Sequence, residues 1–233
     1  MAEPTFSVLL LTAAPPGQAG EAGGAFVKID GRESLLRSVE LFLNRENIKQ
    51  IQLCFLPEME EDGRKKFGAH LGFSGVKVIS GGPRWSDQIA AGVEKLAPEC
   101  THVVVHDAAR PAVPFSDIDA LLEEAAKHQA VVLAAPSRNT LIEVDEGGNA
   151  MAFHLPAQYM QALSPQVYAV ATFKKMATSK QEVHASQVTL LKGSPLTVRI
   201  GGPGDAALVK TMIGMLPKPK SRAASNPFEE AQW

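Results

Sequence analysis

The chain has 233 residues, of which 45% are hydrophobic and 21% are charged, and its formal net charge is −2. This length exceeds that of a disulfide-stapled miniprotein, and this composition is typical of a folded globular domain rather than of a disordered chain. Because the charge is nearly neutral, there is no electrostatic reason to expect a nucleic acid as the partner. We therefore expect small molecules as ligands.

The sequence shows no sign of a membrane span or of secretion. The longest apolar runs, such as residues 131–136, are far shorter than the about 18 residues that a membrane helix needs. The start, Met-Ala-Glu-Pro, has no basic segment before an apolar stretch, so we expect a cytoplasmic protein. Cys54 and Cys100 stand outside any metal-ligand pattern, and we expect two reduced thiols without a chemical role.

Short apolar runs alternate along the chain with segments whose apolar residues recur at helical spacing. The expected strands are 6–11, 51–56, 76–80, 102–106, 131–135, 166–170 and 197–200. The expected helices are 34–42, 58–70, one opening at Ser86, one capped by Ser116, and 206–216, with Ser34 capping the first. Strands that are apolar on both faces and alternate with helices predict an α/β fold with a mostly parallel sheet. Such sheets bind ligands at the carboxyl ends of their strands.

Two segments depart from this alternation. Residues 140–144 and 150–154 flank a Glu-Gly-Gly turn and predict a polar hairpin, inserted as an arm at about residues 138–160. An inserted arm of this kind often makes a subunit contact. From Pro217 the chain is rich in Pro, Lys and Ser without periodicity, which predicts a disordered tail over 217–233. The simplest partition is one domain over 1–216 with an arm and a tail.

The segment His106-Asp107-Ala108-Ala109-Arg110-Pro111 follows the buried strand that begins at His102. An Asp at the end of such a strand places a carboxylate at the mouth of the sheet, and carboxylates are ligands that Mg²⁺ prefers. Arg110 could face a phosphate. Spacing alone leaves an alternative open, in which Asp107 caps the following turn and Arg110 pairs with it.

The same segment resembles the signature of the 2-C-methyl-D-erythritol 4-phosphate cytidylyltransferase family of isoprenoid biosynthesis. The similarity covers nearly the whole chain except the tail. Its other parts are Gly81-Gly82 with Ala91-Gly92-Val93, Ala134-Ala135-Pro136 before Arg138-Asn139-Thr140, Leu163-Ser164-Pro165-Gln166, and Val209-Lys210-Thr211.

The resemblance implies a Rossmann-like, three-layer nucleotidyltransferase fold and a homodimer with interlocking arms. The implied reaction joins CTP to a sugar-alcohol phosphate and releases pyrophosphate, with Mg²⁺ as cofactor. By the resemblance, Asp107 serves the metal or the substrate, Arg110 the substrate phosphate, and Lys210 supplies a charge near the phosphates. Thr140 and Ser164 line the acceptor pocket. The implied nucleotide-binding residues are Ala13, Ala14, Gly82, Gln88 and Ala108.

The first loop departs from the family pattern, which carries an Arg and a Lys for the triphosphate. No basic residue occurs before Lys28, and the alignment places the family's Lys on Gly24. Pro15 and Pro16 also lack the N–H groups that would cradle a phosphate. The family's base-reading Ser aligns with Gln88.

These departures leave three hypotheses open. The first is a Mg²⁺-dependent cytidylyltransferase. The second is a binding or regulatory protein that keeps the fold and has lost turnover, because charge-assisted phosphate contacts are strong and two cations are missing. The third is a nucleotidyltransferase with a changed nucleotide preference.

Overall fold

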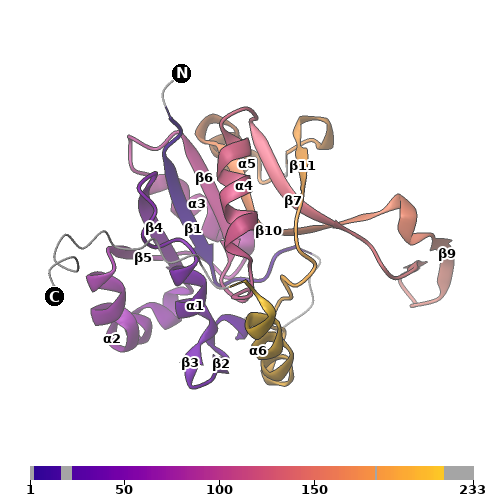
Figure 1. Cartoon of the computed structure of the whole chain (residues 1–233), viewed down its shortest axis with the longest axis horizontal. Helices are drawn as coiled ribbons and strands as arrows, with labels where there is room; N and C mark the ends of the chain where they lie inside the picture. The colour runs from indigo at the N-terminus through magenta and orange to yellow at the C-terminus, as the bar shows by residue number, and fades with distance from the viewer. Residues whose placement is uncertain (1–2, 17–22, 182, 218–233) are drawn as a thin grey trace, which may run out of the picture.

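A seven-stranded sheet forms the centre of the molecule, with the strand order β11-β7-β10-β6-β1-β4-β5 (Figure 1). The computed structural model describes residues 3–16, 23–181 and 183–217. Neighbouring strands are parallel except around β10, which runs antiparallel to β6 and β7. The predicted α/β fold with a mostly parallel sheet is therefore confirmed. The strands are β1 (Phe6–Leu11), β4 (Ile48–Phe55), β5 (Val76–Ser80), β6 (His102–Asp107), β7 (Ala130–Pro136), β10 (Met160–Ala169) and β11 (Thr189–Lys192).

Helices cover both faces of the sheet and make it the middle of three layers. Phe6, Val8 and Leu10 of β1 belong to a core cluster with α1, α2 and α4 on one face, whereas Leu9 and Leu11 pack with α3 and α5 on the other. This alternation follows from the period of two along a strand. The helices are α1 (Ser34–Glu40), α2 (Pro57–Phe73), α3 (Trp85–Glu94), α4 (Phe115–Ala125), α5 (Val170–Ser179) and α6 (Ala206–Met215).

The two predicted serine caps, Ser34 and Ser116, and the predicted helix start at Ser86 are wrong by one or two residues. The N-cap residues are Glu33 for α1, Arg84 for α3 and Pro114 for α4, so Ser34, Ser86 and Ser116 lie inside their helices. The Ser34 hydroxyl donates a hydrogen bond to the Ala108 oxygen at 3.1 Å instead. A buried tertiary partner has replaced the local capping bond that the pattern predicted.

The strand predicted at residues 197–200 is also wrong. This segment pairs with no strand and crosses the turn after β6, where the Ile200 N–H donates to the Ala109 oxygen at 2.9 Å. The edge of the sheet is formed by β11, which pairs with β7 in parallel. The alternation of apolar residues around Arg199 resembles that of a strand. The segment nevertheless forms its backbone hydrogen bond with a turn and not with another strand.

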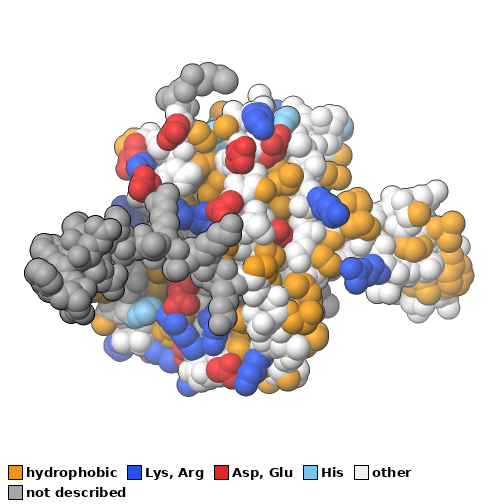
Figure 2. Space-filling model, in the orientation of Figure 1, with side chains coloured by type: hydrophobic (Ala, Val, Ile, Leu, Met, Phe, Trp, Pro, Cys, Tyr) orange, Lys and Arg blue, Asp and Glu red, His pale blue; other side chains and the backbone are white. Residues whose placement is uncertain are grey.

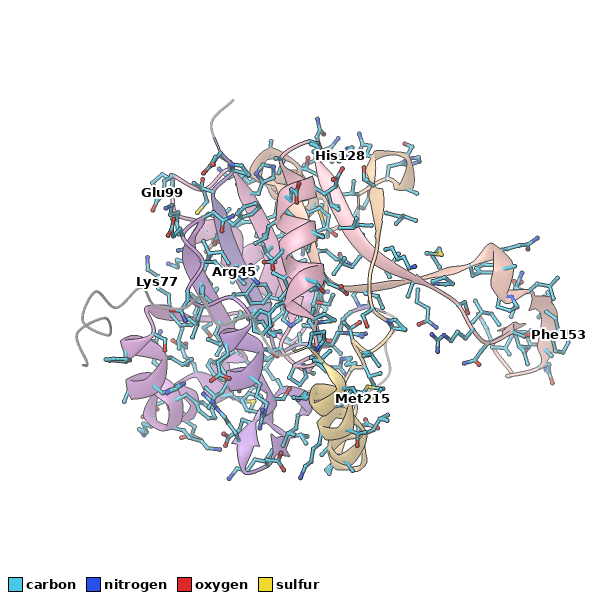
Figure 3. The ribbon with its side chains drawn as sticks, viewed as in Figure 1. Arg45, Lys77, Glu99, His128, Phe153 and Met215 are labelled. Atoms are coloured by element: carbon cyan, nitrogen blue, oxygen red, sulfur yellow. The ribbon has the colours of Figure 1, made fainter. Side chains whose placement is uncertain are left out.

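The arm is a two-stranded hairpin of β8 (Leu141–Val144) and β9 (Ala150–His154), and it projects from the body of the protein (Figure 1). We predicted a polar hairpin, but large apolar side chains are exposed along it, visible as the orange surface at the right of Figure 2. Phe153, labelled near the far end of the arm in Figure 3, is 70% exposed. The other large apolar residues exposed over residues 138–160 are Leu141, Ile142, Val144, Met151, Leu155 and Met160.

Three further findings concern the rest of the chain. Among the described residues, no helix is both long and apolar enough to cross a bilayer. Helix α6 packs beside the small hairpin of β2 (Lys28–Ile29) and β3 (Arg32–Glu33). The predicted tail lies outside the described residues apart from Pro217.

Candidate active site

The carboxyl ends of β1 and β6 lie side by side at the point where the strand order reverses. From β1 the chain continues to β4 and β5 on one side, whereas β6 lies on the other side of β1. The register pairs Leu11 with Asp107, so the loop that begins at Thr12 faces the turn that begins at Ala108. Open α/β sheets bind their ligands at this kind of position.

Asp107 is held by two arginines and by its own turn. One carboxylate oxygen, Oδ1, accepts the Ala109 N–H at 3.0 Å. The other oxygen, Oδ2, accepts the Arg199 Nε–H at 3.0 Å and lies 3.4 Å from the Arg110 Nε. The Asp107 side chain is only 1% exposed. The arrangement matches the alternative left open from spacing, a turn cap paired with Arg110, with Arg199 added.

The site carries more positive than negative charge. Burial raises the pKa of the Asp107 carboxyl, and the guanidinium groups of Arg199 and Arg110 oppose that rise. Burial also lowers the pKa of Arg110. Because two guanidinium groups surround a single carboxylate, one positive charge remains for an anionic ligand when Asp107 is ionised.

Arg199 has a buried nitrogen, Nη2, with no hydrogen-bond partner, and its side chain is only 7% exposed. Buried guanidinium donors normally find a partner. Arg199 and Arg110 line a cavity of about 460 Å³, which Gln161, Ala162, Leu163, Pro195, Thr197 and Val198 complete. The cavity therefore has two guanidinium groups in its lining, and one of them, Arg199, has a donor without a partner.

The metal role predicted for Asp107 does not fit these contacts. Both carboxylate oxygens already accept hydrogen bonds, and the nearest charged neighbours are cations. Within the described ranges, no group of three or more His, Cys, Asp or Glu side chains could hold a metal ion. A resident Mg²⁺ would have to displace a guanidinium from a buried carboxylate, which costs the attraction of the pair.

Ser164 and His106 form hydrogen bonds that hold the Asp107 turn in place. The Ser164 Oγ accepts the Asp107 N–H at 3.0 Å and lies 2.8 Å from His106 Nδ1. His106 Nε2 lies 3.1 Å from the Arg110 carbonyl oxygen. Since a carbonyl only accepts, Nε2 carries the proton and Nδ1 accepts the Ser164 hydroxyl. The Ser164 hydroxyl thus has partners within the protein, and its predicted place in the acceptor pocket stays a prediction.

We expect stability to fall as the pH drops below 6.5. Burial and the nearby Arg110 lower the pKa of His106 from 6.5 to about 3, so the unfolded chain takes up a proton there that the folded chain refuses. This costs at most about 1.4 kcal/mol per pH unit between the two values. Denaturant unfolding at pH 6.5 and pH 5 measures this loss of stability.

His106→Gln should make the free energy of unfolding depend less on pH. The dependence that remains should include that of His102, whose pKa burial also lowers. An equal dependence on pH in the parent and in His106→Gln would contradict this assignment.

Of the residues predicted to bind nucleotide, Ala13, Ala14 and Ala108 follow β1 and β6, whereas Gly82 follows β5 and Gln88 lies in α3. Ala13 and Ala108 are buried, and the Ala108 N–H donates to the Leu11 oxygen at 2.9 Å. Ala14 and Gly82 are half-buried. Gln88 is buried in the first turn of α3, and its side chain contacts Thr12 and Ala13. The structure therefore brings Ala13 and Gln88 together.

In the described part of the chain, Lys210 and Thr140 form no hydrogen bond or ion pair with Asp107, whereas Gly24 packs against Ala109 of the Asp107 turn. Lys210 on α6 is 62% exposed, and its Nζ lies 2.7 Å from Asp30 Oδ1. Thr140 is exposed and directly precedes β8 in the arm. Gly24 is buried, and a Cβ there would lie 2.0 Å from the Ile200 oxygen. A lysine at position 24 is therefore excluded by sterics.

Arg199 is the site residue that sequence reasoning missed. It stands between Val198 and Ile200, which pack partly or fully into the small cluster under α6. The available signal was a single cation within an apolar segment that ends at Gly201-Gly202. We assigned the late cation of the family pattern to Lys210, whereas the structure brings Arg199 to Asp107.

The sequence model for 2-C-methyl-D-erythritol 4-phosphate cytidylyltransferase, IspD, matches residues 8–212. The chain belongs to this family. A curated relative of that name from Rhodopirellula baltica is 26% identical over 229 residues, which cover 88% of this chain and 93% of the relative. A second one, from Clostridioides difficile, is 30% identical over 52% of each chain.

Solved structures of the family share the fold. A structure described as 4-diphosphocytidyl-2C-methyl-D-erythritol synthase has a TM-score of 0.74 at 23% identity and covers 91% of this chain and 100% of its own. A synthase from Anaerococcus prevotii DSM 20548 has a TM-score of 0.73 at 16% identity and covers 91% of this chain and 97% of its own. The predicted family and its three-layer nucleotidyltransferase fold are confirmed.

Proposed function

We propose that this family member transfers a cytidylyl group from CTP to 2-C-methyl-D-erythritol 4-phosphate or a related sugar-alcohol phosphate, with release of pyrophosphate. The observation that carries the proposal is the pair of arginines that meet at Asp107 and line one cavity, where Arg199 has an Nη2 without a hydrogen-bond partner. The names of the relatives supply the substrates. The free cysteines Cys54 and Cys100 fit a reducing compartment such as the cytoplasm.

The proposed reaction needs positive charge near the acceptor phosphate and near the phosphates of CTP. In this transfer an oxygen of the acceptor phosphate attacks the α-phosphorus of CTP, the bond to the β-phosphate oxygen breaks, and pyrophosphate leaves. Catalysis of such a step is mainly positioning and electrostatic stabilisation. Arg199 and Arg110 can hold the acceptor phosphate in the cavity, while Asp107 fixes both guanidinium groups in place. The Arg110 Nη1 is fixed further by its hydrogen bond to the Thr197 oxygen.

We propose that Mg²⁺ enters the reaction bound to the nucleotide substrate. Mg²⁺ binds nucleotide phosphates with few protein ligands, and it neutralises charge on a triphosphate. The closed contacts of Asp107 do not support a resident ion, so we assign no step to a protein-bound metal.

A pyrophosphate-release assay tests the function. The purified chain is incubated with CTP, 2-C-methyl-D-erythritol 4-phosphate and Mg²⁺, with ATP, GTP and UTP as alternative nucleotides. We expect release that needs both CTP and the acceptor. Release with another nucleotide alone would favour the changed-specificity hypothesis, and no release with any nucleotide would contradict the proposed enzyme.

One observation favours a binding protein without turnover as the second candidate. Gly24, the position aligned with the family's catalytic Lys, cannot carry a side chain, and Lys28 lies 4.0 Å from Glu33 rather than at Asp107. In that case CTP or the acceptor phosphate binds without pyrophosphate release, which the same assay combined with a titration detects.

We also propose a homodimer formed through the arm. An exposed arm with seven large apolar side chains is unusual on a monomer, because exposed apolar patches of this kind mark interaction sites. The projecting shape of the arm in Figure 1 allows it to reach a second copy. A symmetric dimer would bury the same patch from both chains.

Phe153→Asp is expected to convert the dimer into a monomer in sedimentation velocity. The charge would be buried in the proposed interface without a partner, which is strongly unfavourable. Phe73→Asp is the matched control, because Phe73 is 96% exposed at the end of α2 and lies outside the arm. A parent chain that sediments as a monomer, or a dimer that Phe153→Asp leaves intact, would contradict the proposed interface.

A further inference from the structure

Gln88 ties the loop after β1 to the first turn of α3. Its Oε1 accepts the N–H groups of Thr12 at 3.0 Å and Ala13 at 3.1 Å. Its Nε2 donates to the Thr12 Oγ1 at 3.3 Å, and the Thr12 hydroxyl donates to the Cys54 oxygen at 2.9 Å. The Gln88 side chain is fully buried. One carboxamide therefore uses both N–H donors that follow the central strand.

These two N–H groups stand where a ligand would need them. They follow the carboxyl end of β1, beside the Asp107 turn, at the reversal of strand order. A carboxamide presents an acceptor and a donor side by side, and the polar edge of a pyrimidine does the same. We propose that Gln88 occupies the base side of the nucleotide site, so that a pyrimidine reaches the Thr12 and Ala13 N–H groups only by displacing it.

The surroundings make that displacement costly. Gly81 packs so closely on the start of α3 that a Cβ there would lie 3.0 Å from the Gln88 Cα and 2.7 Å from the Cys54 Sγ. A displaced carboxamide must leave this packed layer and find new partners, and burying it without hydrogen bonds is unfavourable. Gln88 thus weakens base binding and acts as a specificity-determining residue. The inference rests on the proposed function for the identity of the nucleotide.

The experiment compares the parent with Gln88→Ser and Gln88→Ala by calorimetric titration with CTP, UTP and ATP. We expect both variants to bind CTP about tenfold more tightly than the parent, which corresponds to about 1.4 kcal/mol. Without nucleotide both should melt at a lower temperature, since two backbone N–H groups lose their partner. CTP should then raise the melting temperature more in the variants than in the parent.

Gln52→Ser is the matched control. Gln52 is also fully buried, and its Nε2 donates to the Gly92 oxygen of α3 at 3.3 Å, within the same face of the sheet. This variant should lose stability without gaining affinity for CTP. If it gains as much affinity as Gln88→Ser, general loosening explains the effect and the inference is overturned.

The outcomes separate this inference from the proposed function. Unchanged or weaker CTP binding by both Gln88 variants, with turnover in the parent, overturns the role of Gln88 and leaves the enzyme standing. Tighter binding by the variants, with no turnover in the parent, supports the role of Gln88 and overturns the enzyme. If no protein binds any nucleotide, both fail.

Discussion

Arg199→Ala is expected to lower kcat/KM for pyrophosphate release by about 100-fold to 1,000-fold, the usual cost of removing one preorganised donor to transition-state charge. The Arg199 guanidinium is buried, fixed by Asp107 and carries a donor with no partner inside the protein. Arg199→Lys keeps the charge but loses the planar donor set, so an intermediate loss is expected. Steady-state kinetics with CTP and the acceptor measure both.

Two comparisons make this result decisive. Arg45→Ala is the control, because Arg45 pairs with Asp119 on the outer side of α4 and should leave kcat/KM unchanged. Lys210→Ala tests the rival assignment made from sequence. If Lys210→Ala costs more activity than Arg199→Ala, the late cation is Lys210 and our assignment of the site is wrong.

Asp107→Asn is expected to lower the free energy of unfolding by about 3–5 kcal/mol, since it leaves two buried guanidinium groups without their counter-ion. The amide keeps the shape of the side chain, so the loss reports charge rather than a cavity. Asp119→Asn is the control, because its carboxylate is 62% exposed and pairs with Arg45 at the surface. There the expected cost is about 0–1 kcal/mol.

Inorganic phosphate adds a second readout to the same pair of variants. With Asp107 neutral, Arg110 and Arg199 have more charge to share with an anion, so phosphate should stabilise Asp107→Asn more than the parent. Urea denaturation with and without phosphate measures this. Equal stability of Asp107→Asn and Asp119→Asn would show that Asp107 is no buried counter-ion.

Much of the fold could be predicted because its signal is local. A run such as Val76–Ser80 between polar segments has the bounds in the structure that the pattern predicted. Strand β11 and the first half of β10 were missed, because Thr189–Lys192 is short and Met160–Leu163 lies beside exposed arm residues. The exposed apolar face of the arm was also missed, since a hairpin pattern does not say which side is covered.

The site was only partly predictable, because its main contacts join residues far apart in the chain. Asp107 and Arg110 are three positions apart, and this spacing alone suggested that they pair. Arg199 reaches Asp107 across 92 positions of sequence, and the apolar residues around it resemble a strand. Gln88 likewise contacts Thr12 across 76 positions. Contacts of this kind depend on how helices and turns pack, which no local pattern encodes.

The most direct test of this account is calorimetric titration of the unmodified protein with CTP in the presence of Mg²⁺, with ATP, GTP and UTP as controls. Membership of the family, together with the loop after β1 that lies beside the Asp107 turn, predicts measurable binding of CTP that exceeds binding of the three other nucleotides. Equal binding of all four, or binding of none, would contradict a cytidylyltransferase site at this position.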